Sequence, residues 1–123
     1  MSQEYSFKVL DIRCGTVAQK IDVARVGGWL ILAGSVNIPD PCFSLLALTE
    51  VNPDKQLLKV LIKAIRVKKI CIKCMASAKF ELRYNIYALR AKGIRGNKLH
   101  VKVEYYLRGR QEILFDQEVN ISL

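Results

Sequence analysis

Apolar and polar residues alternate along much of this chain, and this two-residue period constrains its fold more than any other feature. From Leu99 to Leu107 the odd-numbered residues are Leu, Val, Val, Tyr and Leu, while His, Lys, Glu and Tyr stand between them. The segment from Ala76 to Tyr87 repeats the pattern, with its apolar residues at even positions. A strand separates such sets onto two faces, whereas a helix would scatter both around its axis. Both segments are therefore predicted to be half-buried strands.

Weaker versions of the same signal occur elsewhere in the chain. The segment Trp29–Val36 is apolar on both faces and predicts a central strand, with Trp29 as a core anchor. The Asn52-Pro53-Asp54 turn predicts a hairpin between its two flanking strands. Further strands are expected at 5–12, 43–51, 57–67 and 111–119. Ala88–Lys98, with two glycines, is interpreted as a basic loop.

About seven strands with a turn signal every ~8–12 residues predict an all-β fold. We expect one domain over residues 1–123, an antiparallel β-sandwich, with a small β-barrel as the alternative. No apolar run reaches the roughly 18 residues of a membrane span, so no membrane partner is expected. The first residues show no basic segment followed by an apolar one, and a cytoplasmic location is predicted.

Four cysteines, Cys14, Cys42, Cys71 and Cys74, are the one constellation that suggests local chemistry. We favour a disulfide from Cys42 to Cys71 or Cys74, closing a loop of about 30 residues that contributes roughly 3–4 kcal/mol. The open alternatives are free thiols, redox chemistry at the C-x-x-C, and a zinc site in which Cys14 and Cys42 join Cys71 and Cys74, with His100 as an alternative fourth ligand. The prediction therefore includes no metal and no cofactor. A disulfide in the cytoplasm is typical of hyperthermophiles, and the abundant Lys, Ile and Val are compatible with a thermophilic source.

The segment Asn37-Ile38-Pro39-Asp40-Pro41-Cys42-Phe43, the hairpin after it, Cys71 with Cys74 and the alternation of Phe80–Ile86 support one resemblance. The chain resembles small immunoglobulin-like β-sandwich domains of archaea and bacteria. Those domains carry a Pro-x-Pro-Cys segment and a later cysteine bridged to it. The resemblance implies an immunoglobulin-like sandwich, and some domains of this kind are proteinase inhibitors or surface-binding modules.

The charge balance points to acidic partners. Twenty Lys and Arg against eleven Asp and Glu leave a formal net charge of +9. We expect the loops 66–73 and 90–98 to lie at one end of the molecule, where they would form a phosphate-binding patch. Tyr87 and Tyr106, on adjacent strands, could stack on bases. The candidate nucleic-acid-binding residues are Lys63, Arg66, Lys68, Lys69, Lys73, Arg90, Lys92 and Arg95.

Candidates for catalysis are few. His100, the single histidine, falls on the polar face of its strand, and no nucleophile elbow, P-loop or dinucleotide fingerprint occurs. We therefore predict no enzyme. The favoured function is a protein-interaction module, with Leu61 and Ile65 exposed in a monomer and buried by a partner or a second copy. Nucleic-acid binding through the basic loops is the alternative.

Overall fold

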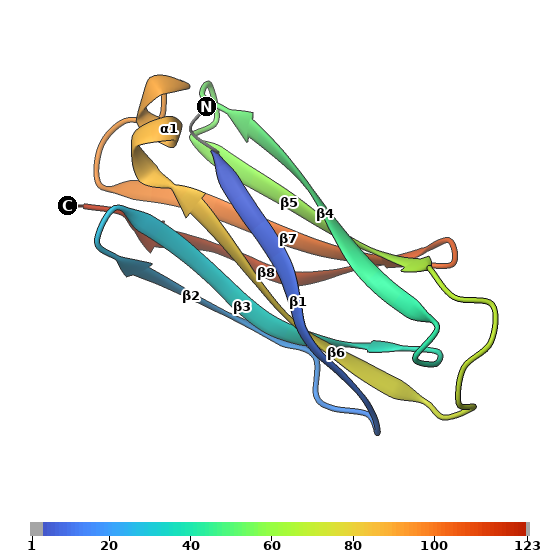
Figure 1. Cartoon of the computed structure of the whole chain (residues 1–123). Helices are drawn as coiled ribbons and strands as arrows, with labels where there is room; N and C mark the ends of the chain where they lie inside the picture. Colours follow the sequence, from blue (N-terminus) through green and yellow to red (C-terminus); the bar gives the residue numbers. More distant parts are fainter. Residues whose placement is uncertain (1–3, 123) are drawn as a thin grey trace.

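The computed structural model describes residues 4–122 and consists of two four-stranded β-sheets packed face to face (Figure 1). The first sheet has the strand order β1-β6-β3-β2 and the second the order β4-β5-β7-β8. The elements are β1 (Tyr5–Cys14), β2 (Lys20–Val26), β3 (Trp29–Ile38), β4 (Phe43–Asn52), β5 (Leu57–Arg66), β6 (Ala76–Asn85), α1 (Ile86–Ala91), β7 (Lys98–Leu107) and β8 (Arg110–Asn120). The predicted all-β sandwich is confirmed, and the two sheets do not close into a barrel.

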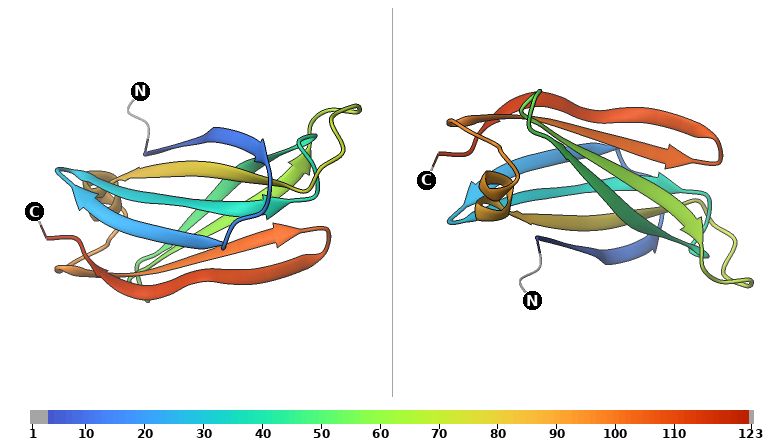
Figure 2. Two further views of the ribbon diagram at one scale, coloured as in Figure 1. Left: turned by 90° about the horizontal axis from the view of Figure 1, so that it is seen from below. Right: turned by 90° about the horizontal axis from the view of Figure 1, so that it is seen from above.

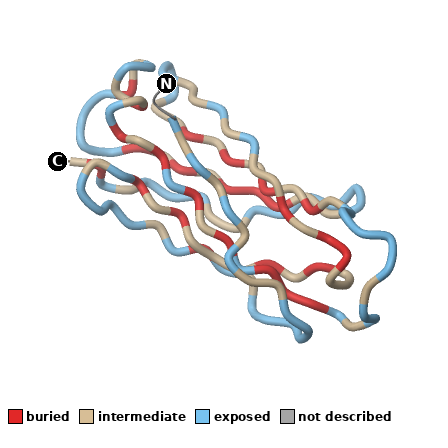
Figure 3. Tube along the Cα trace, in the orientation of Figure 1, coloured by how far each residue is buried: buried red, intermediate tan, exposed pale blue. Residues whose placement is uncertain are grey.

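The core lies between the sheets, where the alternating apolar residues of both meet (Figure 3). Leu30 and Leu32 of β3 and Phe80 and Leu82 of β6 point inward from the first sheet and are buried. The second sheet contributes the buried residues Leu58, Val60, Ile62, Leu99, Val101 and Val103. Burial of these side chains removes apolar surface from water and is the main source of stability. The inward faces of β5, β6 and β7 are those that the alternation predicted.

Trp29 is not the core anchor that the sequence suggested, because its side chain lies on the outer face and is 37% exposed. Its neighbours Leu30 and Leu32 are fully buried, and the two-residue period of a strand then directs Trp29 to the opposite face.

Two features of the sheets also differ from the prediction. An eighth strand, β2, pairs with β3 at the sheet edge; its alternation fails after Val23, where Ala24, Arg25 and Val26 are all exposed. The pairing of β5 with β7 is parallel, whereas all other pairs are antiparallel. This arrangement follows from the long excursion through β6 and α1, which returns the chain to the end where β5 begins.

The start of the expected loop 88–98 is helical. Helix α1 begins after Asn85, whose side-chain oxygen accepts hydrogen bonds from the backbone N–H groups of Tyr87 and Ala88. Ile86 and Leu89, three positions apart, are buried beneath it. Gly93, with a φ of +101°, ends the turn in a conformation that glycine adopts without strain. One capping asparagine and one pair of apolar residues three positions apart are too few to predict a helix from the sequence. The basic residues and glycines that follow favoured a loop instead.

Candidate binding loop

The segment Val67–Met75, which joins β5 to β6, is the most unusual surface of the molecule. It extends beyond the ends of both sheets (Figures 1 and 2). Ile70 is 89% exposed, Ile72 73% and Met75 68%, and Val67 is exposed as well. Large aliphatic side chains are ordinarily buried, so a cluster of exposed ones on a single loop requires an explanation. We call this segment the binding loop.

Two disulfides hold the binding loop. Cys71 is bonded to Cys42 at the start of β4, and Cys74 is bonded to Cys14 at the end of β1. The loop is thus attached to both sheets, because β4 and β1 belong to different ones. The predicted bridge from Cys42 to Cys71 is present. The other candidate, Cys74, pairs with Cys14, which the sequence had suggested only as a zinc ligand.

The bridged cysteines and their neighbours in the loop differ in exposure. Cys71 and Cys74 turn toward the body of the molecule, and both are partly buried. Ile70 and Ile72 flank Cys71 and are both exposed, so the two isoleucines face water while the bridged cysteine between them is partly buried.

Backbone hydrogen bonds anchor both ends of the binding loop. The N–H groups of Val67 and Lys68 donate to the Cys42 carbonyl at 2.8 and 3.1 Å. At the other end, the Gly15 N–H donates to the Met75 carbonyl at 2.8 Å. The Arg66 guanidinium donates to the Lys69 carbonyl at 3.2 Å. A loop with these anchors presents its apolar tip in one geometry and loses little conformational entropy on binding.

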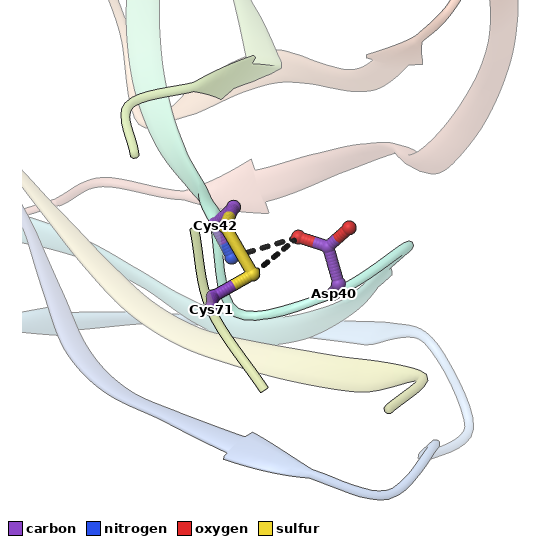
Figure 4. Close-up of side chains that lie close together, drawn as sticks. All are labelled: Asp40, Cys42 and Cys71. Atoms are coloured by element: carbon purple, nitrogen blue, oxygen red, sulfur yellow. Dashed lines mark hydrogen bonds between the residues drawn. A yellow bond between two sulfur atoms is a disulfide. The ribbon is translucent and has the colours of Figure 1, made fainter. Parts of the chain in front are cut away.

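Asp40 lies under the first disulfide (Figure 4). Its carboxylate accepts a hydrogen bond from the Cys42 N–H at 2.8 Å and lies 3.3 Å from the Cys71 sulfur. A disulfide sulfur carries no proton, so the second approach is a close contact rather than a donated hydrogen bond. Asp40, Cys42 and Cys71 have the donor atoms of a small metal site. With both sulfurs joined in a disulfide, however, they are not thiolates, which is the form that zinc requires.

Positive charge surrounds the loop tip. Lys68, Lys69 and Lys73 are all exposed, and the sequence from Arg66 to Met75 contains no acidic residue. Two arginines flank the Phe43 ring at the base of the loop: the Arg66 guanidinium lies 5.8 Å and the Arg108 guanidinium 5.2 Å from its centre. Cation–π contacts of this kind hold both charges at this end of the sandwich.

The predicted nucleic-acid-binding residues do not form one patch. Lys63, Arg66, Lys68, Lys69 and Lys73 lie on β5 or the binding loop, whereas Arg90, Lys92 and Arg95 belong to α1 and the turn after it, at the opposite end (Figure 2). The expected common end of the two basic loops is therefore wrong. Strands β6 and β7 run in opposite directions along the sandwich, so the connection between them lies at the far end from the loop that precedes β6.

Arg90, Lys92 and Arg95 each have a hydrogen-bond or ion-pair partner close to α1. The Arg90 guanidinium donates to the Gly96 carbonyl at 2.5 Å, and Lys92 forms an ion pair of 2.9 Å with Glu4. The pKa of Lys92 is raised, chiefly by its hydrogen bond with Glu4. The backbone N–H of Arg95 donates a hydrogen bond of 2.6 Å to the side-chain oxygen of Gln56. These contacts stabilise the turn after α1.

Tyr87 and Tyr106 do not lie on adjacent strands either. Tyr87 is on α1, with its ring against Gly28, where an added Cβ would lie 2.9 Å from a ring carbon. Tyr106 is on the outer face of β7, with the Lys63 ammonium 5.3 Å from its ring centre. The two rings therefore do not make a common stacking surface.

The outer face of β5, where Leu61 and Ile65 alternate with lysines, was the predicted interaction surface. It carries less exposed apolar surface than the binding loop. Leu61 and Ile65 are partly buried, and Leu48, opposite Leu61 on β4, is 55% exposed. Glu104 of β7 is buried on this same face, with the Lys59 and Lys102 ammonium groups 3.9 and 3.5 Å from its carboxylate.

No protein-family model matches the chain, and neither the curated proteins nor the solved structures contain a significant match. Among the described residues, no helix has the length and the apolar composition needed to cross a bilayer.

Proposed function

We propose that this protein is a non-enzymatic binding module that contacts its partner with the binding loop. The observation that carries the proposal is the combination of exposure and rigidity: Ile70, Ile72 and Met75 stand in water on a loop held by two disulfides. Exposed aliphatic side chains contribute nothing to the core, and a fixed loop places them for a contact with something outside the chain. The sequence-based expectation of a protein partner or a second copy belongs to this proposal.

The arrangement of the polar groups supports a binding role over catalysis. His100 faces Asp116 on the outer face of the second sheet, where both side chains are 41% exposed. A pocket of about 360 Å³ lies at the turn between β7 and β8. Its lining consists of Gln19, Tyr105, Leu107, Arg110, Gln111 and Glu112. This set holds no serine, cysteine or histidine that a neighbouring base could activate. Ser35 and Ser77 line a second pocket, which holds no histidine, and the pocket lined by His100 and Asp116 holds no serine or cysteine.

The disulfides also bear on location. Four cysteines in two bridges are typical of an oxidising compartment, and reducing cytoplasm breaks such bonds in most organisms. We therefore propose an oxidising environment in place of the cytoplasmic location that the sequence suggested. Hyperthermophiles are the exception, because their intracellular proteins also carry disulfides.

A stability measurement tests whether the apolar tip belongs to the fold or to a contact. The double substitution Ile70→Ala and Ile72→Ala is expected to change the free energy of unfolding by less than about 0.5 kcal/mol, because both side chains are exposed in the folded state. The matched control Ile62→Ala, in the core, is expected to cost about 2–5 kcal/mol. Urea unfolding followed by circular dichroism gives both values. A large loss in the double variant would make the tip a packing element and would contradict the proposal.

Site-specific photocrosslinking tests the contact itself. A benzophenone amino acid at position 70, in cells of the source organism, is expected to form a defined adduct, whatever the chemical class of the partner. The same group at position 98, exposed at the other end of the sandwich, is the control. The adduct at position 70 should disappear when Ile72→Ser and Met75→Ser are added. No adduct at position 70, or equal adducts at both positions, would overturn the proposal.

A further inference from the structure

The composition of the binding loop identifies the kind of surface it fits. Its exposed side chains are aliphatic or sulfur-containing at the tip and lysine beside it. The cores of protein–protein interfaces are enriched in aromatic residues and arginine and depleted of lysine. The sequence from Arg66 to Met75 has no aromatic residue. Lysine beside aliphatic groups is instead typical of segments that lie at the boundary between water and lipid, where the ammonium groups reach the headgroups.

The geometry agrees with a flat, anionic surface. The binding loop projects beyond both sheets, so a planar surface can reach its tip before meeting the strands (Figures 1 and 2). Lys68, Lys69 and Lys73 are exposed around Ile70 and Ile72, and their charges are not opposed by any acid within the loop. Asp40, the nearby carboxylate, lies 4.0 Å from the Arg66 guanidinium and is only partly exposed. None of these three lysines forms an ion pair within residues 4–122. Three such lysines at one tip attract a negatively charged surface over about one Debye length, ~8 Å at physiological salt.

We propose that the binding loop docks on the surface of an anionic phospholipid bilayer, with Ile70, Ile72 and Met75 in the interfacial region and Lys68, Lys69 and Lys73 on the headgroup phosphates. This inference rests on the proposed function and names its partner. The sequence-based expectation of no membrane partner concerned a spanning segment. Surface docking needs no span, because a few apolar side chains and several cations supply the affinity together.

Nucleic acid is the other polyanion that three lysines could attract. Single-stranded binding sites combine a cationic groove with aromatic rings on which bases stack. The binding loop instead offers aliphatic side chains, and Tyr87 lies at the far end of the sandwich. Tyr106 lies on the outer face of β7, outside the loop, with the Lys63 ammonium over its ring. Ile70 and Ile72 would gain little from contact with phosphates. The apolar tip therefore favours lipid over nucleic acid, and the two sources are separated by experiment.

The test uses the full oxidised chain and sedimented vesicles of phosphatidylcholine with about 30% phosphatidylserine, with pure phosphatidylcholine vesicles as the reference. Each lysine near a charged bilayer contributes about a fivefold change in partitioning. The double substitution Lys68→Gln and Lys69→Gln is therefore expected to lower the partition coefficient about 25-fold. Ile70→Ser with Ile72→Ser is expected to lower it by at least about tenfold, because two buried aliphatic side chains are lost.

Matched variants at other sites control for general charge and hydrophobicity. Arg95→Gln with Lys98→Gln removes two cations at the opposite end, and Leu48→Ser removes an exposed aliphatic side chain from β4. Both are expected to bind vesicles as the wild type does. Circular dichroism confirms that each variant is folded. In an Ile72→Trp variant with Trp29→Phe, the indole emission should shift to the blue with anionic vesicles and be quenched by brominated acyl chains.

Several results would overturn the inference. One is the absence of wild-type binding to the anionic vesicles; another is binding that the isoleucine substitutions leave unchanged. A third is binding to a single-stranded DNA of about 30 nucleotides that is as tight as, or tighter than, binding to the vesicles. In that case the lysine substitutions would abolish DNA binding and the isoleucine substitutions would leave it unchanged. The proposed function would survive any of these if the photocrosslinker at position 70 forms its adduct with a protein. Both proposals fail if neither vesicles nor the crosslinker show a contact at the loop.

Discussion

The Tyr105 side chain spans the two sheets. Its hydroxyl, on β7, donates a hydrogen bond of 2.7 Å to the Asn37 carbonyl of β3. Burial, with a smaller contribution from the Glu112 charge, raises the pKa of Tyr105 to about 12. The neutral phenol is therefore part of the folded state. An unfolded tyrosine ionises near pH 10.

This difference predicts a loss of stability in alkali. Below pH 10 both states keep the proton, and the contribution of Tyr105 is complete. Between pH 10 and pH 12 only the unfolded state releases it, so the free energy of unfolding falls by about 1.4 kcal/mol per pH unit from this group. Tyr105→Phe should cost about 1 kcal/mol at pH 7 through the lost hydrogen bond. Its urea midpoint should also fall less steeply than that of the wild type above pH 10. Parallel pH profiles for the two proteins would contradict this account.

The binding loop is stabilised by different partners at its two ends, one disulfide at each. The two bridges join cysteines that are 60 and 29 residues apart in the sequence. Each bridge restricts the unfolded chain, which typically stabilises the folded state by about 2–4 kcal/mol. The Cys42–Cys71 bridge lies beside the hydrogen bonds from Val67 and Lys68 to the Cys42 carbonyl. The Cys14–Cys74 bridge lies beside the hydrogen bond from Gly15 to the Met75 carbonyl.

Removing one bridge at a time should release one end at a time. In Cys42→Ala with Cys71→Ala, the amides of Val67 and Lys68 are expected to lose hydrogen-exchange protection while Gly15 keeps it. In Cys14→Ala with Cys74→Ala the pattern should reverse. Each pair should lower the free energy of unfolding by about 2–4 kcal/mol. Loss of protection at both ends in either variant would show that the loop unfolds as one unit.

At the scale of the whole molecule, stability depends on one interior shared by both sheets. Phe80 of β6 is fully buried in that interior. Phe80→Ala is expected to cost about 3–5 kcal/mol, because the facing strands cannot close the cavity completely. Unfolding should remain a single transition, with coincident midpoints from far-ultraviolet circular dichroism and from Trp29 fluorescence. The control Leu48→Ala, on the outer face, should stay within about 0.5 kcal/mol of the wild type. Separate midpoints for the two probes would mean that the sheets unfold independently.

The candidate site was visible in the sequence only in part. Cys71-Ile72-Lys73-Cys74 between two predicted strands, with lysines on both sides, indicated a constrained basic connection. The pairing of Cys74 with Cys14 was not predictable, because 60 residues separate them and the strand order decides which cysteines meet. The exposure of Ile70 and Ile72 was missed for the same reason. Ile70 and Ile72 lie beside a bridged cysteine in the connection between β5 and β6, outside both sheets, and that placement depends on the whole fold.

The sequence by itself determined the all-β class, most of the strands and their inward faces, because alternation is a local property that each strand carries within its own residues. It also determined the excess of positive charge. The tertiary structure alone decided the parallel pairing of β5 with β7, the outward position of Trp29, the two disulfide pairs and the separation of the basic loops to opposite ends. Those features depend on which distant segments meet, and contacts between distant segments leave no period in the chain from which they could be inferred.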